Sequence, residues 1–340
     1  MRDSLTRDGL AGDDPARDDP ARDDLTRHDL TRHDLTDAYR RCQALHRRYG
    51  RSYYLATRLL PAWKRRHVHA LYGFTRYADE IVDAPDGSTT REREGRLRAW
   101  GDAFRAGDLN DPLLPAVLHT VEVFGLDRAD FDRFLAAMAM DLTVRRYRDY
   151  AALLDYMAGS AGAIGTMMLP ILLAGDGPDA GADAGKARQA GKAAREPARQ
   201  LGLAFQLTNF IRDIAEDLSR DRVYLPEEDL RRFGVTVEDL RRCARRRAAS
   251  APVRELVAFE VARAREHYAL AAPGVTMLPT ASQACIRAAY RLYGGILGEI
   301  VRAGYDVFGG RVRVSVPRRL ALAAASLATP PGRPVSPFDL

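Results

Sequence analysis

The sequence predicts an all-α protein built as one helical domain. Apolar residues recur at the spacing of helical turns through most of the chain, which is the primary signal for amphipathic helices. The best candidate for a strand, residues 312–316, is too short to be convincing. With 46% hydrophobic residues among 340, the chain can build a substantial core. No internal boundary divides the helical part, so we expect a single domain over residues 38–327.

The N-terminal segment differs in composition from the rest of the chain. Residues 13–37 form a five-residue repeat that begins DDPAR and ends HDLTD. Residues 1–37 hold six Arg and eleven Asp, a net charge of −5, with few large apolar residues. Such a segment cannot bury enough apolar surface to fold, so we expect a disordered acidic repeat tail over residues 1–37.

Helices are expected along the remainder of the chain, and their ends are defined only to a few residues. The expected segments are about 37–48, 52–60, 63–84, 89–107, 112–125, 127–146, 150–174, 197–219, 236–249, 251–272, 282–308 and 316–327. Residues 175–196 are rich in Gly, Ala, Asp and Lys, which predicts an exposed loop. The Pro-rich residues 328–340 are expected to form a disordered tail.

The helical part of the chain is basic. The whole chain has a net charge of +6, so by subtraction of the tail the remainder carries about +11. A basic body suits an anionic substrate, an anionic membrane surface or nucleic acid. The arginine cluster at 241–247 lacks interleaved aromatic residues, so we expect no nucleic-acid partner. Steeply salt-dependent DNA binding would favour the alternative of a basic helical nucleic-acid binder.

Cysteine usage and hydropathy indicate a compartment. Cys42, Cys243 and Cys285 are scattered without metal or redox spacing, which favours a reducing cytoplasm. The N-terminus is acidic and polar, unlike a signal peptide. The longest apolar runs, such as 164–174, are too short to span a bilayer. We therefore expect a cytoplasmic protein that is soluble or peripheral to a membrane.

Two rows of polar residues carry the chemistry. In the helix expected at 63–84, the first row consists of Tyr72, Arg76, Asp79 and Asp83. These residues are separated by 4, 3 and 4 positions and therefore share one face. The second row is separated by 3, 4 and 4 residues and consists of Gln206, Asn209, Asp213 and Asp217. Carboxylates four residues apart repel one another on a helix. A cation bound between them would remove this repulsion, so such rows suggest a cation site.

A divalent cation explains both rows together better than ordinary surface charge does. Either row alone is compatible with a solvated helix face that carries intrahelical ion pairs. Together, each with a neighbouring arginine (Arg76 and Arg212), they suggest two helix faces that clasp Mg²⁺ and the charge of a phosphate group. If they bind Mg²⁺, we expect these carboxylates to be ionised, with lowered rather than raised pKa values.

The two rows also carry a family resemblance. The motifs are 79–83 (DEIVD), 209–217 (NFIRDIAED) and 222–226 (RVYLP). They resemble the two acidic motifs of the squalene/phytoene synthase family, and most closely its bacterial phytoene synthases, over roughly residues 38–325. The resemblance implies an isoprenoid-synthase-type helical bundle with a central cavity, and Mg²⁺ as cofactor. The implied metal ligands are Asp79, Glu80, Asp83, Asn209, Asp213 and Asp217.

The resemblance extends to substrate-binding and catalytic residues. Implied catalytic residues are Asp79, Asp83, Asp213, Asp217 and Tyr156. Implied substrate-binding residues are Ser52, Tyr53, Tyr72, Arg76, Gln206, Asn209, Arg212, Arg222, Tyr224 and Tyr305. The small residues that follow Tyr156, up to Gly165, resemble a segment that lines an isoprenoid pocket, although close helix packing would need the same residues. The tyrosines could face a carbocation or bind diphosphate, and the sequence leaves both roles open.

The implied reaction is head-to-head condensation of two geranylgeranyl diphosphates to phytoene through a cyclopropylcarbinyl diphosphate. Squalene, dehydrosqualene or presqualene diphosphate synthases, which use farnesyl diphosphate, are alternatives, because a pocket discriminates weakly between chain lengths. A non-catalytic scaffold or assembly subunit is an alternative of another class. The partners expected are a prenyl diphosphate substrate and, for release of an apolar product, a peripheral membrane contact.

Overall fold

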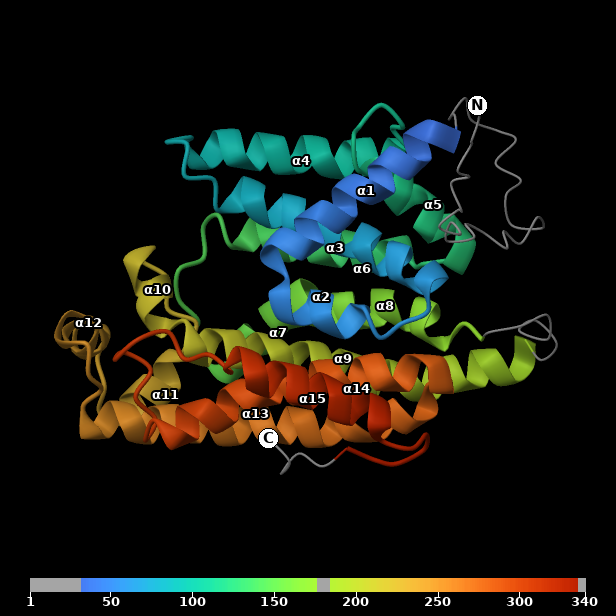
Figure 1. Cartoon of the computed structure of the whole chain (residues 1–340). Helices are drawn as coiled ribbons and strands as arrows, with labels where there is room; N and C mark the ends of the chain where they lie inside the picture. Colours follow the sequence, from blue (N-terminus) through green and yellow to red (C-terminus); the bar gives the residue numbers. More distant parts are fainter. Residues whose placement is uncertain (1–31, 176–183, 336–340) are drawn as a thin grey trace, which may run out of the picture.

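The computed structural model describes residues 32–175 and 184–335, and these fold into helices, as predicted (Figure 1). In chain order the helices are α1 (Arg32–Tyr49), α2 (Arg51–Thr57), α3 (Ala62–Val82), α4 (Thr90–Ala106), α5 (Leu114–Phe124), α6 (Arg128–Met140), α7 (Tyr150–Met157), the π-helix η1 (Ala158–Gly162), α8 (Ala163–Leu173), α9 (Ala184–Arg212), α10 (Ile214–Ser219), α11 (Glu227–Arg232), α12 (Val237–Arg246), α13 (Ala251–Met277), α14 (Thr280–Arg302) and α15 (Val316–Ala328).

The helices form two groups with a shared interface. Figure 1 shows α1, α3, α4, α5 and α6 on one side and α9, α13, α14 and α15 on the other, with α2 and α8 between them. One apolar core joins the first group to α8 and to the first half of α14, and a second lies around α7, α9, α13 and α14. The short helices α10, α11 and α12 gather at one end. This end is where α3 and α9 both finish.

Glycines allow the central helices to approach closely around η1. A Cβ atom at Gly202 of α9 would lie 2.3 Å from the backbone oxygen of Ala161, and one at Gly165 would lie 2.3 Å from that of Ala198. Gly159 meets α6 in the same way. The small residues after Tyr156 therefore serve close helix packing, the alternative that the sequence left open, while several of them also line a cavity described below.

The continuous helical stretch Tyr150–Leu173, which includes η1, is long and apolar enough to cross a membrane by length and composition. The sequence interpretation had considered only shorter runs here. Of its most apolar window, 67% is buried inside the protein, against α6 and α9. Burial of this kind is typical of the core helix of a soluble protein.

The described helices differ from the predicted domain boundaries at both ends and in the middle. Residues 32–37 belong to α1 rather than to a tail, and residues 184–196 form the first turns of α9 rather than a loop. Residues 1–31, 176–183 and 336–340 lie outside the described residues. After α15 the chain is held by the buried side chain of Arg287, whose guanidinium donates to the backbone oxygens of Ser326, Thr329, Pro330 and Arg333. These contacts place the segment that follows α15 against α14, where a free tail was expected.

Some helix limits also differ from those predicted. The segment expected at 127–146 ends at Met140, and the one expected at 197–219 breaks at Asp213. Helix α11 was not predicted, because its six residues are too few to show a periodic pattern. Residues 312–316 form the approach to α15 and not a strand.

Replacing Gly202 with alanine tests the close packing. We expect Gly202→Ala to lower the free energy of unfolding by about 1–3 kcal/mol, because the new methyl group overlaps the backbone of η1. The control is Gly95→Ala on the exposed face of α4, where a Cβ would meet nothing within 4 Å. There the gain in helix propensity should stabilise by about 0.5–1 kcal/mol. Urea unfolding of both variants measures the difference, and equal effects would contradict the packing model.

Candidate functional site

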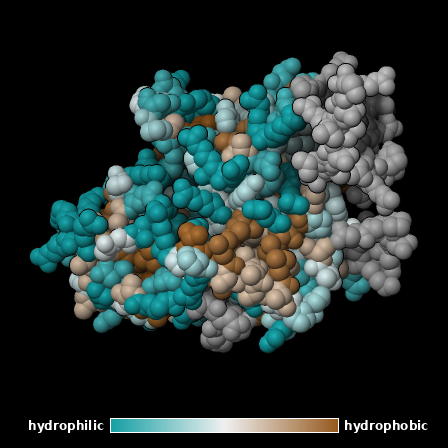
Figure 2. All heavy atoms as spheres, in the orientation of Figure 1, coloured by the Kyte–Doolittle hydropathy of each residue, from teal (hydrophilic) through white to brown (hydrophobic). Residues whose placement is uncertain are grey.

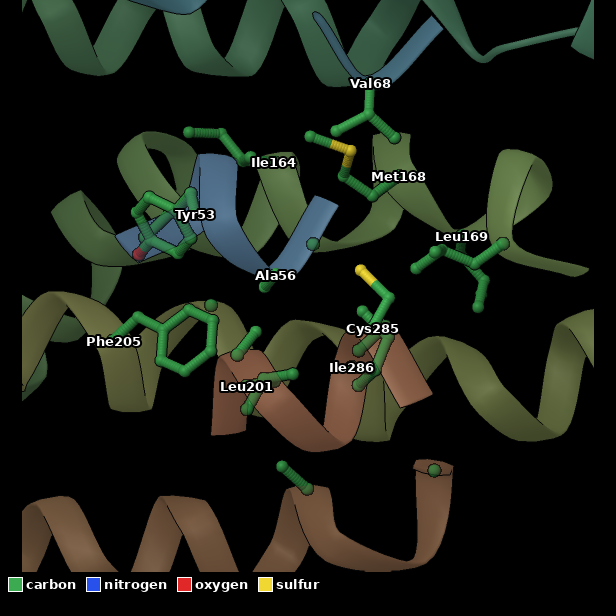
Figure 3. Close-up of a pocket in the computed structure, with 18 of the residues that line it drawn as sticks. Tyr53, Ala56, Val68, Ile164, Met168, Leu169, Leu201, Phe205, Cys285 and Ile286 are labelled. Carbon is green, nitrogen blue, oxygen red and sulfur yellow. The ribbon is translucent and has the colours of Figure 1, made fainter. Parts of the chain in front are cut away.

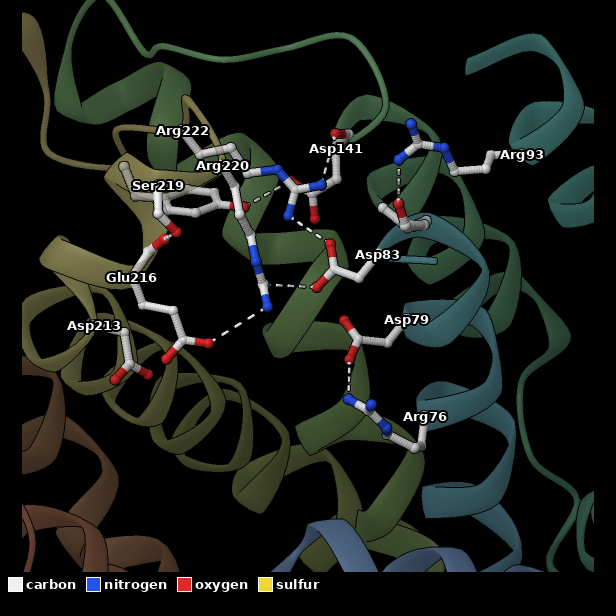
Figure 4. A network of polar contacts seen from close by, with 12 residues as sticks. Arg76, Asp79, Asp83, Arg93, Asp141, Asp213, Glu216, Ser219, Arg220 and Arg222 are labelled. Carbon is white, nitrogen blue, oxygen red and sulfur yellow. Dashed lines mark hydrogen bonds and ion pairs between the residues drawn. The ribbon is translucent and has the colours of Figure 1, made fainter. Parts of the chain in front are cut away.

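The two acidic rows predicted from the sequence lie at the same end of the bundle. Asp79 and Asp83 occupy the last turn and the C-cap of α3, and Asp213 follows the last residue of α9 (Figure 4). Arg220 links the first row to α10, which continues the second row, since it pairs with Asp83 at 2.9 Å and with Glu216 at 3.4 Å. Two helices far apart in sequence thus form the opposite walls of one acidic cleft.

The break at Asp213 leaves the second row on one face. Although α9 ends at Arg212, the backbone N–H of Asp213 donates to the carbonyl of Asn209, and that of Asp217 donates to the carbonyl of Asp213, both at 2.9 Å. Both bonds have the i→i−4 spacing of an α-helix, so they join Asn209, Asp213 and Asp217 in one row across the bend.

Arginines surround the carboxylates. Arg76 pairs with Asp79 at 2.6 Å, and its other nitrogen donates to Glu80 at 3.2 Å, which places Glu80 on the Arg76 side of the first row. Arg222 is almost fully buried and pairs with Asp83 at 2.8 Å. Because a guanidinium can release a carboxylate to bind phosphate oxygens instead, these residues form an anion site beside a cation site.

The second row has arginine partners of its own. Arg212 makes a two-pronged ion pair with the adjacent Asp213. Arg311, from the segment between α14 and α15, reaches the same carboxylate at 3.1 Å and Glu216 at 3.4 Å. Arg220 and Arg311 were missed from the sequence, because both stand outside the periodic helix faces on which the prediction relied.

Burial and crowding raise the pKa values of two carboxylates in the cleft. Desolvation, followed by repulsion from Asp83, raises the pKa of Asp79 to about 6. Desolvation, followed by repulsion from Asp213, raises the pKa of Asp217 to about 7. The arginines of the protein alone do not compensate fully for burial and for the crowded carboxylates, and the lowered pKa values were expected only of carboxylates that bind Mg²⁺. The cleft therefore favours an additional positive charge.

The donor set fits a hard divalent cation. The side-chain oxygen of Asn209 is buried and has no hydrogen-bond partner among the described residues, although it shares a face with Asp213 and Asp217. Within 34–175 and 189–335, no three His, Cys, Asp or Glu side chains converge into a preformed metal cluster. A cation here would be bound by one or two carboxylates and would need oxygens from a ligand as well, which is how Mg²⁺ usually binds.

A buried carboxylate that the sequence interpretation missed organises the back of the cleft. Asp141 accepts hydrogen bonds from the hydroxyls of Tyr156 at 2.6 Å and Tyr224 at 3.0 Å, and its backbone oxygen accepts from Arg222 at 3.2 Å. Burial raises the pKa of Asp141. The hydroxyls of Tyr156 and Tyr224 therefore hold Asp141. Asp141 escaped notice because no other acid stands at helical spacing from it.

An apolar cavity of about 240 Å³ adjoins the acidic cleft (Figure 3). It lies between α2, α3, α8, α9, α13 and α14. Its polar end is lined by Tyr53, Tyr72, Thr75 and Gln206, all near the acidic rows, and its far end by residues such as Leu172, Ala194 and Leu278. The sequence prediction of a central cavity is confirmed, with charge at one end and hydrocarbon-like walls behind it.

The substrate-binding residues predicted around the cavity are only partly brought together. Tyr53 stacks on Tyr293 with ring centroids 4.3 Å apart, beside Phe205. Tyr293 was missed, since an isolated aromatic residue on an apolar helix gives no signal of function. Tyr305 lies in the turn after α14 with a left-handed backbone (φ +61°) and packs against the second core. Ser52 and Tyr305 are not among the residues that line the cavity.

Binding of a divalent cation should strengthen as pH rises. Asp79 and Asp217 are partly protonated near pH 6 to 7, and a carboxyl group must lose its proton to become a ligand. We expect the affinity for Mn²⁺, measured by electron paramagnetic resonance, to rise by about tenfold or more from pH 6 to pH 8. Asp217→Asn should flatten this dependence. An affinity that does not change over this range would contradict the proposed ligands.

Comparison with known proteins agrees with the geometry. The family model for squalene/phytoene synthase matches residues 46–319. The chain is 35% identical to 15-cis-phytoene synthase of Synechocystis sp. over 292 residues, which is 84% of this chain and 82% of that protein. It is 34% identical to chloroplastic phytoene synthase 2 of Solanum lycopersicum over 300 residues, which is 87% of this chain and 93% of that protein.

Solved structures show the same fold. A dehydrosqualene synthase in complex with ligand superposes with a TM-score of 0.75 at 24% identity and covers 87% of this chain and 97% of its own. A squalene synthase of Alicyclobacillus acidocaldarius superposes with a TM-score of 0.68 at 25% identity and covers 81% of this chain and 97% of its own. The helical arrangement is therefore shared with these enzymes.

Proposed function

This chain belongs to the squalene/phytoene synthase family, and from that premise we propose that it joins two molecules of geranylgeranyl diphosphate head to head to form phytoene. It is a prenyltransferase of carotenoid biosynthesis. The observation that carries the proposal is the position of the acidic cleft at the polar end of a long apolar cavity. A diphosphate and a prenyl chain need these two environments side by side.

The cavity length suits a long prenyl chain. Along α9 its lining runs from Gln206 to Ala194, twelve residues, which corresponds to roughly 18 Å of helix. Apolar side chains make up most of the wall. Such a wall excludes water, which would otherwise capture a carbocation. The reaction proceeds through a cyclopropylcarbinyl diphosphate, so diphosphate leaves twice. The same cavity must therefore keep water away from two successive carbocations.

The charged residues of the cleft have separate roles in binding and releasing diphosphate. Arg76, Arg212 and Arg222 are placed to bind diphosphate oxygens and to stabilise the charge released when the carbon–oxygen bond breaks. Asp141 holds Arg222 in place through its backbone oxygen. Mg²⁺, when bound, would neutralise the diphosphate and make it a better leaving group. The residues proposed to hold it are Asp79, Asp83, Asn209, Asp213 and Asp217.

An assay with two substrates tests the proposal. Purified protein with Mg²⁺ and geranylgeranyl diphosphate should form phytoene without NADPH, detected by mass analysis of the extracted lipids. Farnesyl diphosphate should be the poorer substrate. Asp213→Ala should lower turnover by at least about 100-fold, because the cleft loses a ligand. Asp102→Ala on the exposed surface of α4 is the matched control and should leave turnover unchanged.

The outcomes separate the alternatives. A C30 product from farnesyl diphosphate alone would keep the mechanism and change the substrate. Absence of any product from folded, metal-loaded protein would favour a non-catalytic scaffold. An Asp213→Ala enzyme of normal activity would contradict the assignment of the cleft.

We also propose that the enzyme works in the cytoplasm, attached peripherally to an anionic membrane through α15. This helix exposes Val316, Leu320 and Leu327, which are 55% to 60% accessible and lie on one face. Figure 2 shows apolar residues gathered where α2, α14 and α15 lie in the same view. Arg313 and Arg319 flank this face and suit anionic headgroups. A C40 hydrocarbon product is nearly insoluble in water and dissolves in the apolar interior of a membrane.

Vesicle binding checks the membrane proposal. Leu320→Glu should weaken sedimentation with anionic phospholipid vesicles by about tenfold or more, because burial of a leucine contributes about 1.5–3 kcal/mol. The control is Leu270→Glu, which changes an equally exposed leucine on α13. Equal binding of the two variants would contradict a contact through α15, and absence of vesicle binding by the unaltered protein would contradict the membrane proposal itself.

A further inference from the structure

Two buried histidines form a pair beside the cavity. The Nδ1 atoms of His46, on α1, and His69, on α3, lie 2.9 Å apart, so one ring donates a hydrogen bond to the other. Both side chains are buried, at 1% and 4% accessibility. Neither histidine belongs to the acidic rows. No sequence pattern connects the two histidines, because they stand 23 residues apart.

The outer nitrogen of His46 is left without a partner. His46 lines the apolar cavity, and its Nε2 atom is buried with no hydrogen-bond partner among the described residues. The ring is held by stacking on Tyr72, with centroids 4.1 Å apart, and by an edge contact with Tyr54. Only glycine fits at position 50, next to this ring, because a Cβ there would lie 2.6 Å from the His46 ring. A polar atom that costs free energy to bury is thus fixed in an apolar wall.

His46 lies at the depth along the cavity where the reacting carbons of the substrate are expected. Tyr72, on which it stacks, precedes Asp79 by seven residues on α3, and Gln206 precedes Asp213 by seven residues on α9. Both therefore lie about 10 Å below the acidic rows along their helices. A prenyl chain whose diphosphate sits in the cleft places its first carbons in this part of the cavity.

The proposed reaction needs a proton acceptor there. The central double bond of phytoene joins the two carbons that carried diphosphate. Each of these carbons loses one C–H bond as its new carbon–carbon bonds form. Two protons must therefore leave for every phytoene formed. The residues assigned so far bind or release diphosphate, and the hydroxyls of Tyr156 and Tyr224 already donate to Asp141.

We propose that Nε2 of His46 accepts a proton from C1 of the cationic intermediate, with His69 as the second member of a proton relay. The C–H electron pair becomes the new carbon–carbon bond and neutralises the cation. A bond forms between the proton and Nε2 of His46, while the proton on Nδ1 of His46 moves to Nδ1 of His69. This inference rests on the proposed function, because it assigns a base within that reaction.

The surroundings keep both rings neutral before the reaction. Burial, with a smaller contribution from His69, lowers the pKa of His46 to about 3. Burial, followed by the charge of Arg65, lowers the pKa of His69 to about 4. Besides these groups, Tyr54 from α2 and Tyr72 from α3 face the pair. A carbocation with an adjacent C–H bond is acidic enough to protonate even so weak a base.

The test separates ionisation from proton loss. We would measure diphosphate release and phytoene formation in parallel for the unaltered enzyme, His46→Gln and His69→Gln, with substrate carrying hydrogen or deuterium at C1. Glutamine fills most of the space and can bond to the remaining histidine, but it is not a base. Phytoene formation by His46→Gln should fall by about 100-fold, the usual contribution of a general base, while diphosphate release falls less than threefold. The C1 deuterium isotope effect on phytoene formation should increase.

The outcomes distinguish this inference from the proposed function. No phytoene from the unaltered enzyme would contradict the function itself. If both variants keep the normal ratio of phytoene to diphosphate and the normal isotope effect, the histidines are not the acceptor, and released diphosphate takes the proton. Parallel loss of both products in both variants would also overturn the relay, because it indicates a role in folding. His67→Gln, a buried histidine that does not line the cavity, is the matched control and should keep the normal ratio.

Discussion

The site depends on holding two rows of carboxylates together at the C-terminal ends of α3 and α9. The helix dipole already concentrates negative charge at such ends, so each row is placed where a carboxylate is least favourable. Crowding and burial then raise the pKa of Asp79 and Asp217. Arg76 and Arg212 on these helices, together with Arg220, Arg222 and Arg311 from later in the chain, offset some of this charge. The negative charge that remains can be neutralised by a cation. The crowding of the carboxylates therefore favours binding of a metal ion and, with it, of diphosphate.

The same two helices connect the charged site to the apolar one. Residues of α3 and α9 line both the cleft and the cavity, so the distance between diphosphate and prenyl chain is set by rigid helices. Glycines at 165 and 202 let α8 and η1 approach α9 closely, which forms a continuous wall on that side. A carbocation generated at the cleft therefore moves directly into a region lined by hydrocarbon and aromatic rings, where water has little access.

Much of this arrangement was predictable because it follows from helical periodicity. The rows containing Asp79 and Asp213 were found from spacing alone, and the all-α fold from the apolar pattern. The remainder depends on contacts that the sequence does not encode locally. Asp141, Arg220 and Arg311 reach the cleft from turns, and the pairing of His46 with His69 exists only after α1 packs on α3. The raised pKa values of Asp79 and Asp217 could not be predicted, because spacing along a helix does not convey how deeply a side chain is buried. The C-terminal segment seemed disordered because its anchor, Arg287, lies on another helix.

The central claim is that both acidic rows bind one shared cluster of metal and diphosphate. The most direct measurement is a crystal structure with Mn²⁺ and a non-reactive thio-analogue of geranylgeranyl diphosphate, with anomalous scattering used to locate the metal. The account predicts Mn²⁺ between Asp79 or Asp83 on one side and Asn209, Asp213 or Asp217 on the other, with the prenyl chain in the cavity between α8 and α9. Metal bound to one row alone, or a diphosphate bound outside the cleft, would contradict it.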